Sequence, residues 1–267
     1  MKIGLAQLNS RQNKAANLAA AGEAIDSLAG QGADLVLLPE MSNFHGLEDS
    51  YAETAEPIPG PSSQWAQAKA REHGVFLHCG SFAERRGDLV YNTGVVFARS
   101  GAELARYSKM HLFDADTPDG LHYRESDAFA AGSEVVTCDC DGVVFGLAIC
   151  YDVRFPQLFH ALADRGADVF LLPSAFTIPT GISHWEPCLR ARAIENGCYM
   201  AACGQWGRYA RGRENYGHSM VIDPWGVILA QCREGTDTLV ADLDMEHLQR
   251  VRQRLPVQRH RRRDLFG

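Results

Sequence analysis

The chain lacks an apolar run long enough to cross a membrane. Its apolar stretches, such as Ala33 to Pro39 with Asp34 inside it, fall far below the roughly 20 residues that a spanning helix needs. The first strand-like segment turns polar at Asn9, before the apolar core of a signal peptide could form. These absences predict a soluble, cytoplasmic protein with no membrane partner.

Positive charge is also scarce. The 267 residues contain 26 Lys and Arg against 33 Asp and Glu, which gives a formal net charge of −7. This balance disfavours a dedicated nucleic-acid binder. The arginines between Arg250 and Arg263 form one basic tail on an acidic chain, which favours a solvated helix end or a subunit contact. We therefore expect no nucleic-acid partner.

The eight cysteines form neither a CxxC pair nor a regular disulfide framework. In a long, apolar chain this usage predicts reduced cysteines that are mostly buried. A metal site could be sought at Cys138-Asp139-Cys140 together with His122, but no second pair of ligands matches it. The cysteine pattern thus predicts no metal site.

Hydrophobic residues make up 46% of the chain, which is enough to form the core of one substantial domain. No linker rich in Ser, Gly or Pro divides it, so we expect residues 1–267 to form a single domain. Three segments of the first half resemble three of the second half in the same order, which predicts a pseudo-twofold fold. The pairs are Ile3–Ala6 with Phe145–Ala148, Gly32–Pro39 with Gly166–Pro173, and Tyr91–Phe97 with Tyr216–Ile222.

Each half reads as strand, helix, strand, helix, strand, strand. Asn13 and Ser62 are candidate caps for the helices of the first half. In the second half Pro156 suits the first turn of a helix, and Ser183–Glu186 fits a capping box for a helix that runs to Asn196. This α/β pattern predicts a four-layer α-β-β-α sandwich, with a single doubly wound sheet as the alternative.

Two reactive residues directly follow apolar strands, where ligands of α/β folds gather. Glu40 follows Leu35–Pro39, and Cys150 follows Val143–Ile149. A cysteine at a strand-to-helix turn is presented as a nucleophile, and burial would raise the pKa of Glu40 towards neutrality, as a general base requires. Lys109, after another strand, could stabilise an oxyanion. Taken singly, these residues could equally be a core cysteine, a loop carboxylate and a surface lysine.

Together, the three segments resemble the nitrilase, or carbon-nitrogen hydrolase, superfamily. The matching motifs are Leu37-Leu38-Pro39-Glu40, Tyr107-Ser108-Lys109-Met110-His111-Leu112 and Ile149-Cys150-Tyr151-Asp152-Val153-Arg154-Phe155-Pro156. The resemblance continues through His184-Trp185 and Tyr216–Gly226, and so covers essentially the whole chain.

This resemblance implies a role for each matching residue. Cys150 corresponds to the nucleophile, Glu40 to the general base, and Lys109 to the group that stabilises the tetrahedral intermediate. A second glutamate of the family falls on Glu125, which would orient Lys109, and the backbone N–H of Tyr151 would be a second oxyanion donor. The implied reaction is amide hydrolysis through a thioester, which requires no metal and no organic cofactor.

Within the superfamily, the segments after Cys150 look like those of the Nit-type amidases, which act on amides of 2-oxo acids. The resemblance implies that Arg154 and Thr180 hold the 2-oxo carboxylate, although Arg154 could instead pair with Asp152. It favours hydrolysis of deaminated glutathione to 2-oxoglutarate and Cys-Gly. ω-Amidase activity on 2-oxoglutaramate is the alternative, and a nitrile or carbamoyl substrate stays open.

A protein that only binds such compounds would be expected to lose Glu40, Lys109 or Cys150, and all three are present. In the family the C-terminal segment reaches a partner subunit. The resemblance therefore implies that residues 244–267, approximately, contact a second copy in a homodimer or larger homo-oligomer.

Overall fold

The structure, a computed structural model, describes residues 1–266, so that Gly267, the last residue of the segment expected to contact a partner, lies outside the described residues. The helices are α1 (Lys14–Gly30), α2 (Tyr51–Thr54), α3 (Pro61–His73), α4 (Pro156–Asp164), α5 (Ile178–Asn196), α6 (Met245–Arg254), α7 (Val257–His260) and α8 (Arg263–Phe266). Three short 3-10 helices are η1 (Glu48–Ser50), η2 (Glu125–Asp127) and η3 (Cys150–Arg154).

Two large sheets form the centre of the molecule. The first has the order β17-β1-β2-β3-β5-β4, with β6 paired to β5, and the second has the order β16-β15-β12-β11-β10-β9. The strands of the first sheet are β1 (Lys2–Gln7), β2 (Leu35–Leu37), β3 (Phe76–His78), β4 (Phe82–Arg86), β5 (Leu89–Phe97), β6 (Glu103–Ser108) and β17 (Asp237–Asp242). Those of the second are β9 (Thr137–Cys140), β10 (Val143–Leu147), β11 (Val169–Ser174), β12 (Tyr199–Gly204), β15 (Met220–Ile222) and β16 (Ile228–Gln231).

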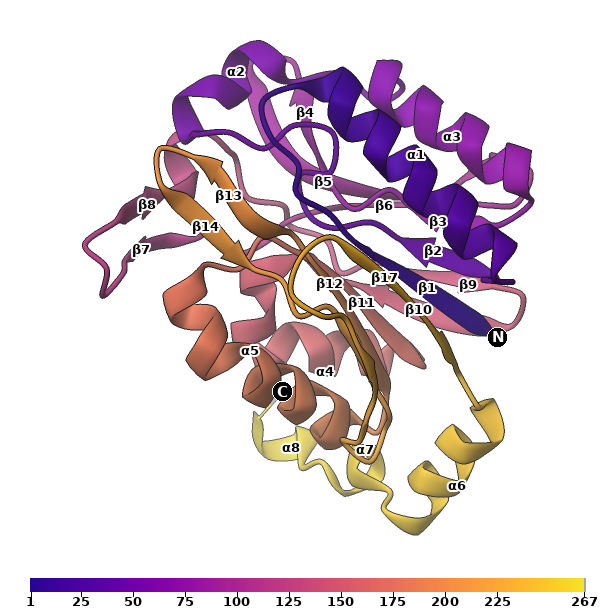
Figure 1. Ribbon diagram of the computed structural model, residues 1–267. Coiled ribbons are helices and arrows are strands. Elements are labelled where there is room, and N and C mark those ends of the chain that lie inside the picture. Colours follow the sequence, from indigo (N-terminus) through magenta and orange to yellow (C-terminus); the bar gives the residue numbers. More distant parts are fainter. Residues whose placement is uncertain (267) are drawn as a thin grey trace.

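Two hairpins, β7–β8 (Asp114–Asp116 and His122–Arg124) and β13–β14 (Trp206–Ala210 and Arg213–Tyr216), form small sheets of their own. In Figure 1 both hairpins project at the same end of the molecule.

Helices cover the outer face of each sheet. Figure 1 shows α1 and α3 above the first sheet and α4 and α5 below the second, with the sheets between them. One buried apolar cluster contains residues of both sheets, including Leu5 and Leu37 of the first and Leu147 and Leu171 of the second. This arrangement confirms the α-β-β-α sandwich and excludes the single doubly wound sheet.

The two sheets repeat the same strand pattern, as the internal resemblance predicts. β1, β2 and β3 are parallel neighbours, and β5 is added antiparallel to β3. β10, β11 and β12 are likewise parallel neighbours, and β15 is added antiparallel to β12. Strands β2 and β11, and β1 and β10, therefore hold equivalent places in the two halves.

The predicted helix starts are correct at Asn13 and wrong at Ser62. The Asn13 side chain accepts a hydrogen bond from the Ala16 N–H at 3.1 Å, as an N-cap does. Helix α3 instead begins at Pro61, because proline is pre-organised for the first helical turn, and Ser62 binds Glu56 through its N–H and its hydroxyl.

The predicted start of α5 is also wrong. The helix begins at Ile178, so that Ser183 lies inside it and caps nothing. Pro179 sits in the first turn, where the missing N–H costs no hydrogen bond. In contrast, α4 begins at Pro156 as expected.

The C-terminal segment packs on its own chain. Arg252 of α6 binds the Asp168 carboxylate at 2.7 Å, and Arg261 binds Asp164 at 3.2 Å. The basic tail is thus partly neutralised by nearby carboxylates. None of the helices within residues 1–266 combines the length and the apolar character needed to cross a bilayer.

Glycines at equivalent positions of the repeat let each sheet approach its helix. A Cβ added at Gly4 of β1 would lie 3.0 Å from Leu28 Cδ2 of α1, and one at Gly146 of β10 would lie 3.1 Å from Leu162 Cβ of α4. Both distances are shorter than an ordinary contact between carbon atoms. The close approach of helix and sheet thus depends on glycine in both halves.

We expect Gly146→Ala to lower the free energy of unfolding by about 1–3 kcal/mol, because the added methyl group overpacks the interface with α4. Denaturant titration of the purified variant measures this loss. The control is Gly30→Ala at the end of α1, where an added Cβ meets nothing within 4 Å. Equal stability of the two variants would contradict the close packing of β10 on α4.

Candidate active site

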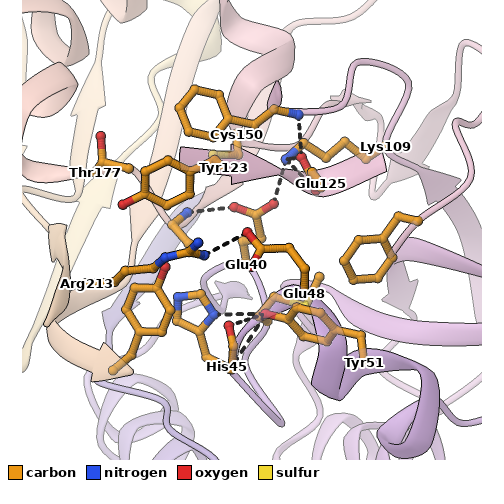
Figure 2. A pocket seen from close by; sticks show the side chains of 16 residues that line it. Glu40, His45, Glu48, Tyr51, Lys109, Tyr123, Glu125, Cys150, Thr177 and Arg213 are labelled. Atoms are coloured by element: carbon orange, nitrogen blue, oxygen red, sulfur yellow. Dashed lines mark hydrogen bonds and ion pairs between the residues drawn. The ribbon is translucent and has the colours of Figure 1, made fainter. Parts of the chain in front are cut away.

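The segments after β2 and β10 bring Glu40 and Cys150 to one pocket. Glu40 follows the last residue of β2 by three positions, and Cys150 follows the last residue of β10 by three positions. Both side chains line the pocket that also contains Lys109 and Glu125. In Figure 2, Cys150, Lys109 and Glu125 lie above, His45 and Tyr51 lie below, and Glu40 lies between them. The structure therefore brings together the four residues that the sequence singles out.

Cys150 stands at a strained turn of the backbone. Its φ is 48°, in the left-handed region that residues with a side chain rarely adopt, and it opens η3 directly after the β10 segment. Such strain is typical of residues whose orientation matters for function.

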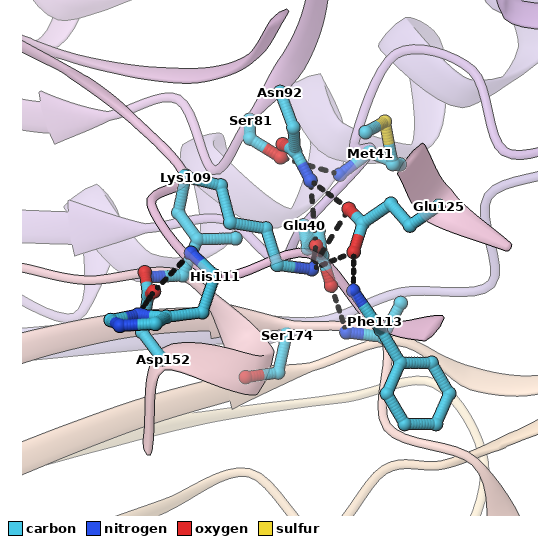
Figure 3. A network of polar contacts seen from close by, with 12 residues as sticks. Glu40, Met41, Ser81, Asn92, Lys109, His111, Phe113, Glu125, Asp152 and Ser174 are labelled. Atoms are coloured by element: carbon cyan, nitrogen blue, oxygen red, sulfur yellow. Dashed lines mark hydrogen bonds and ion pairs between the residues drawn. The ribbon is translucent and has the colours of Figure 1, made fainter. Parts of the chain in front are cut away.

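The Asp152 carboxylate holds this turn in place. It is fully buried and accepts hydrogen bonds from the Ile149 N–H at 2.9 Å, the Tyr107 hydroxyl at 2.7 Å and the His111 N–H at 3.1 Å. Its Oδ1 also lies 2.7 Å from Nδ1 of the His111 ring. Tyr107 and His111 flank Lys109 in the sequence, so Asp152 ties the turn of Cys150 to the lysine segment. Figure 3 shows the contact of Asp152 with His111.

Lys109 lies buried between two carboxylates. Its Nζ donates to Glu40 Oε1 at 3.0 Å and to both oxygens of Glu125 at 2.9 and 2.8 Å. Only 2% of Lys109 is exposed, so the ammonium depends on these partners in place of water. Figure 3 shows the three side chains converging on one point.

The Asn92 side chain joins the same two glutamates, and the sequence reasoning missed it. Its Nδ2 donates to Glu40 Oε1 at 2.8 Å and to Glu125 Oε1 at 3.2 Å. The backbone N–H of Ala175 reaches Glu40 Oε2 at 2.7 Å, and that of Phe113 reaches Glu125 Oε2 at 2.6 Å. A polar Asn-Thr pair in the middle of β5, between its apolar ends, is the signal that could have revealed Asn92.

The two glutamates differ in their electrostatics. Burial favours the neutral form of Glu40, but the Lys109 charge and hydrogen bonds from Cys150, Lys109 and Asn92 outweigh it and lower the pKa of Glu40. The expectation of a raised Glu40 pKa is therefore wrong, because burial is not the only effect. For Glu125, burial and the Glu40 charge outweigh the attraction of Lys109 and raise the pKa. Glu40 is thus the carboxylate held ready to accept a proton.

The proton that Glu40 can accept sits on Cys150. Burial and the Glu40 charge raise the pKa of the Cys150 thiol well above its usual value, although Lys109 opposes the shift. Burial by itself would lower the pKa of Lys109. The charges of Glu125, Glu40 and Cys150 outweigh this effect and raise the pKa well above its usual value, so the lysine stays charged. In the resting site a neutral thiol therefore faces an ionised carboxylate, and an ammonium lies beside both.

The two expected carboxylate-binding residues lie next to residues of the segment that joins β11 to α5. Arg154 Nη1 lies 3.2 Å from His184 Nδ1, and Thr180 Oγ1 lies 2.8 Å from Thr177 Oγ1. Thr177 lines the pocket, but neither Arg154 nor Thr180 does. The alternative ion pair of Arg154 with Asp152 is wrong, because Asp152 is already occupied by the donors of the cysteine turn.

The wall opposite Cys150 carries polar residues that the sequence reasoning missed. Arg213 of β14 binds Glu48 Oε1 at 2.7 Å, and His45 stacks on Tyr209 with ring centroids 3.7 Å apart. These residues come from segments far apart in the chain, and no local motif connects them. The pocket is thus completed by the β13–β14 hairpin and by the loop after Glu40.

The metal alternative does not form a cluster. Cys138 and Cys140 are buried in the core between the sheets, while His122 is exposed on the β7–β8 hairpin and contacts Asp116 at 2.7 Å. Among residues 1–266 one group of three potential ligands lies close together, namely Asp26, Glu72 and His73, and Lys69 makes ion pairs with two of its members.

We expect no thiolate on Cys150 at neutral pH. Because its pKa is raised, the sulfur keeps its proton as the pH increases through the usual range for cysteine and loses it only under more alkaline conditions. The measurement is the ultraviolet difference spectrum between the unmodified protein and Cys150→Ser, with Cys188→Ser in α5 as the control. A thiolate band at neutral pH that disappears only in Cys150→Ser would show that this description is wrong.

Comparison with known proteins agrees with this geometry. The family described as carbon-nitrogen hydrolase matches residues 2–253. The chain is 43% identical over 261 residues to deaminated glutathione amidase from Synechocystis sp., covering 96% of each chain, and 35% identical to omega-amidase NIT2 from Danio rerio, covering 100% of this chain and 96% of the other. The crystal structure of Saccharomyces cerevisiae Nit3, a member of the nitrilase superfamily, matches with a TM-score of 0.89 and 33% identity over 98% of this chain and 96% of that chain. The chain therefore belongs to the carbon-nitrogen hydrolase family.

Proposed function

We propose that this protein hydrolyses the amide bond of a 2-oxo acid amide, with deaminated glutathione as the substrate and 2-oxoglutarate and Cys-Gly as the products. The observation that carries the proposal is that Glu40, Lys109 and Cys150 line one pocket, with Lys109 Nζ 3.0 Å from Glu40 Oε1. This set is suited to acyl transfer, and the 43% identical relative from Synechocystis bears the name of this activity.

In the first half of the reaction, the Cys150 sulfur attacks the amide carbonyl as its proton passes to Glu40. Lys109 Nζ and the backbone N–H of Tyr151 stabilise the oxyanion that forms. When the carbon–nitrogen bond breaks, Glu40 returns the proton to the leaving nitrogen. The amine departs, and the 2-oxo acyl group stays on Cys150 as a thioester.

In the second half, Glu40 removes a proton from a water molecule, and the resulting hydroxide attacks the thioester carbonyl. The same two donors stabilise the second oxyanion. The carbon–sulfur bond then breaks, and the proton on Glu40 returns to the sulfur. The products are the free 2-oxo acid and the original thiol, so the cycle needs no cofactor.

Glu125 is proposed as the residue that positions Lys109. It contacts Nζ through both carboxylate oxygens, and its own position is fixed by the Phe113 N–H and by Asn92. Glu40 makes a single contact with Nζ and also interacts with Cys150, so it is the carboxylate that exchanges a proton with the thiol.

Arg154 and Thr180 are proposed to bind the 2-oxo carboxylate. The segment that joins β11 to α5 supports this role: Arg154 lies over the Phe176 ring at 5.3 Å, and Thr180 contacts Thr177. Both residues are therefore next to the stretch whose Ala175 and Thr177 line the pocket. A guanidinium group matches the two oxygens of a carboxylate.

ω-Amidase activity on 2-oxoglutaramate is the second candidate. It would place the same 2-oxoglutaryl group on Cys150 and would differ only in the leaving group, which would be ammonia in place of Cys-Gly. The 35% identity to the omega-amidase NIT2 of Danio rerio supports this second candidate activity.

We further propose a cytoplasmic homodimer or larger homo-oligomer in which residues 244–267 contact the partner. Exposed apolar side chains at Leu255 and Leu265, 42% and 62% accessible, support a contact surface along the described part of this segment. All eight cysteines are free thiols, which agrees with a reducing compartment.

Incubation with deaminated glutathione and, separately, with 2-oxoglutaramate tests the proposed substrate through the release of 2-oxoglutarate. We expect faster turnover of deaminated glutathione and no turnover of either by Cys150→Ser, because serine is a far weaker nucleophile without a stronger base. Cys188→Ser should behave like the unmodified protein.

Preference for 2-oxoglutaramate would make the protein an ω-amidase. Hydrolysis of neither compound would contradict both substrates.

A further inference from the structure

Asn92 of β5 contacts each of the three charged residues at the centre of the site. It is buried, with 1% of its surface exposed. Its Nδ2 donates to Glu40 Oε1 at 2.8 Å and to Glu125 Oε1 at 3.2 Å, and its backbone carbonyl accepts from the Lys109 N–H at 2.8 Å. In Figure 3 the amide lies above the point at which the three charged side chains meet. An uncharged side chain is thus built into a cluster of charges.

Asn92 and Lys109 bind the same two carboxylate oxygens. Lys109 Nζ lies 3.0 Å from Glu40 Oε1 and 2.9 Å from Glu125 Oε1, the oxygens that Asn92 Nδ2 also contacts. An amide nitrogen carries two hydrogens, so it can donate one to each oxygen. The two glutamates therefore share one charged donor and one uncharged donor.

One ammonium cannot neutralise two carboxylates. When two carboxylates share a site, the repulsion between them favours a proton on one of the pair. A proton on Glu40 would leave it unable to accept the proton of Cys150. Hydrogen bonds from Asn92 stabilise the ionised form of a carboxylate, and the contact is shorter to Glu40 than to Glu125. The amide therefore favours negative charge on Glu40.

The electrostatics of the two glutamates agree with this division. Burial favours the neutral form of Glu40, but Lys109, Cys150 and Asn92 together lower its pKa. Burial, together with the Glu40 charge, raises the pKa of Glu125. Of the two carboxylates, the one with the shorter contact to Asn92 is therefore the one that stays ionised.

Several other titratable groups surround Glu40. Burial lowers the pKa of His45 to about 4 and raises that of Tyr51 well above its usual value, so both are uncharged at neutral pH. Arg213 is paired with Glu48 at 2.7 Å. The charge on Glu40 therefore depends on its direct partners. The full set of titratable groups around it is Lys109 after β6, Glu125 in η2, Cys150 in η3, His45 in the loop after β2, Tyr51 in α2, Glu48 in η1 and Arg213 in β14.

The oxygen of the Asn92 side chain is unpaired. Oδ1 has no hydrogen-bond partner among residues 1–266. A buried polar atom without a partner costs stability, and native proteins rarely keep one without a reason. The nitrogen of the same side chain supplies a reason, because it donates to both carboxylates of the site.

We propose that Asn92 is a positioning residue for amide hydrolysis, whose side-chain N–H groups hold the Glu40 and Glu125 carboxylates beside Lys109 and keep the negative charge on Glu40. This inference rests on the proposed function, because it takes Glu40 as the group that accepts the proton of Cys150. Asn92 acts through Glu40 and needs no contact with the substrate.

The test measures the pH dependence of kcat/KM for deaminated glutathione and for 2-oxoglutaramate. Asn92→Leu keeps the approximate size of the side chain but removes the donor, and Asn92→Ala removes it without adding a methyl group at a tight position. Asn43→Leu is the matched control. Asn43 is 2% exposed and its Oδ1 is also unpaired, but its Nδ2 donates to the Ser62 hydroxyl at 2.8 Å and to no carboxylate of the site.

In the unmodified protein kcat/KM should fall at low pH, where Glu40 becomes protonated. Loss of the Asn92 donor raises the affinity of Glu40 for a proton, so this fall should occur at higher pH in both Asn92 variants. We expect a shift of roughly one to two pH units, the effect of losing one hydrogen bond to a charged oxygen. Asn43→Leu should show the profile of the unmodified protein.

Infrared difference spectroscopy of the ligand-free protein follows the same proton without a substrate. A protonated carboxyl group has a carbonyl band of its own, and the band that is missing in Glu40→Gln reports Glu40. We expect this band to appear at higher pH in Asn92→Leu and Asn92→Ala than in the unmodified protein.

Protonation of Glu40 at an unchanged pH in a folded Asn92 variant would overturn the inference, even if the melting temperature or the rate fell, because the role of Asn92 would then be structural only. An equal shift in Asn43→Leu would overturn it as well. Hydrolysis of neither compound by the unmodified protein would contradict the proposed function, while the infrared titration would still decide whether Asn92 keeps Glu40 ionised.

Discussion

The buried Lys109 ammonium between Glu40 and Glu125 is the interaction on which the site depends. Removing the Lys109 charge would leave two carboxylates buried without a counter-charge, which typically costs several kcal/mol. The same ammonium keeps Glu40 ionised, and burial together with the Glu40 charge raises the pKa of Cys150 and keeps the proton on its sulfur. The proposed nucleophile is therefore stored as a thiol, with a carboxylate that can take its proton in the same pocket.

The repeated strand pattern of the two sheets positions these residues. Glu40 and Cys150 follow strands that belong to the two halves of the pseudo-twofold pattern, and the stacking of the sheets brings their ends to one pocket. Polar side chains then fix the details: Asp152 ties the cysteine turn to the lysine segment, and Asn92 joins the two glutamates. The residues of the candidate site thus rest on buried parts of the fold.

Much of this could be predicted, because the information is local. The strand ends at Glu40 and Cys150 are apolar runs followed by a reactive residue, and the repeat of Gly32–Pro39 in Gly166–Pro173 indicates two equivalent halves. The start of α5 was not predictable from Ser183, because a capping pattern inside a longer helix looks the same as one at its start. The pKa of Glu40 could not be predicted from burial alone, since its direction depends on partners more than 50 residues away, such as Asn92 at a separation of 52 residues.

Cys150 is proposed to carry the acyl group of the substrate during amide hydrolysis. Intact-protein mass spectrometry after rapid acid quenching of the reaction tests it most directly, with peptide mapping to locate the modification. Deaminated glutathione and 2-oxoglutaramate should both produce the same mass increase, that of a 2-oxoglutaryl group in place of the thiol proton, on the peptide that contains Cys150. Turnover without any adduct on that peptide, or an adduct that persists in Cys150→Ser, would contradict the account.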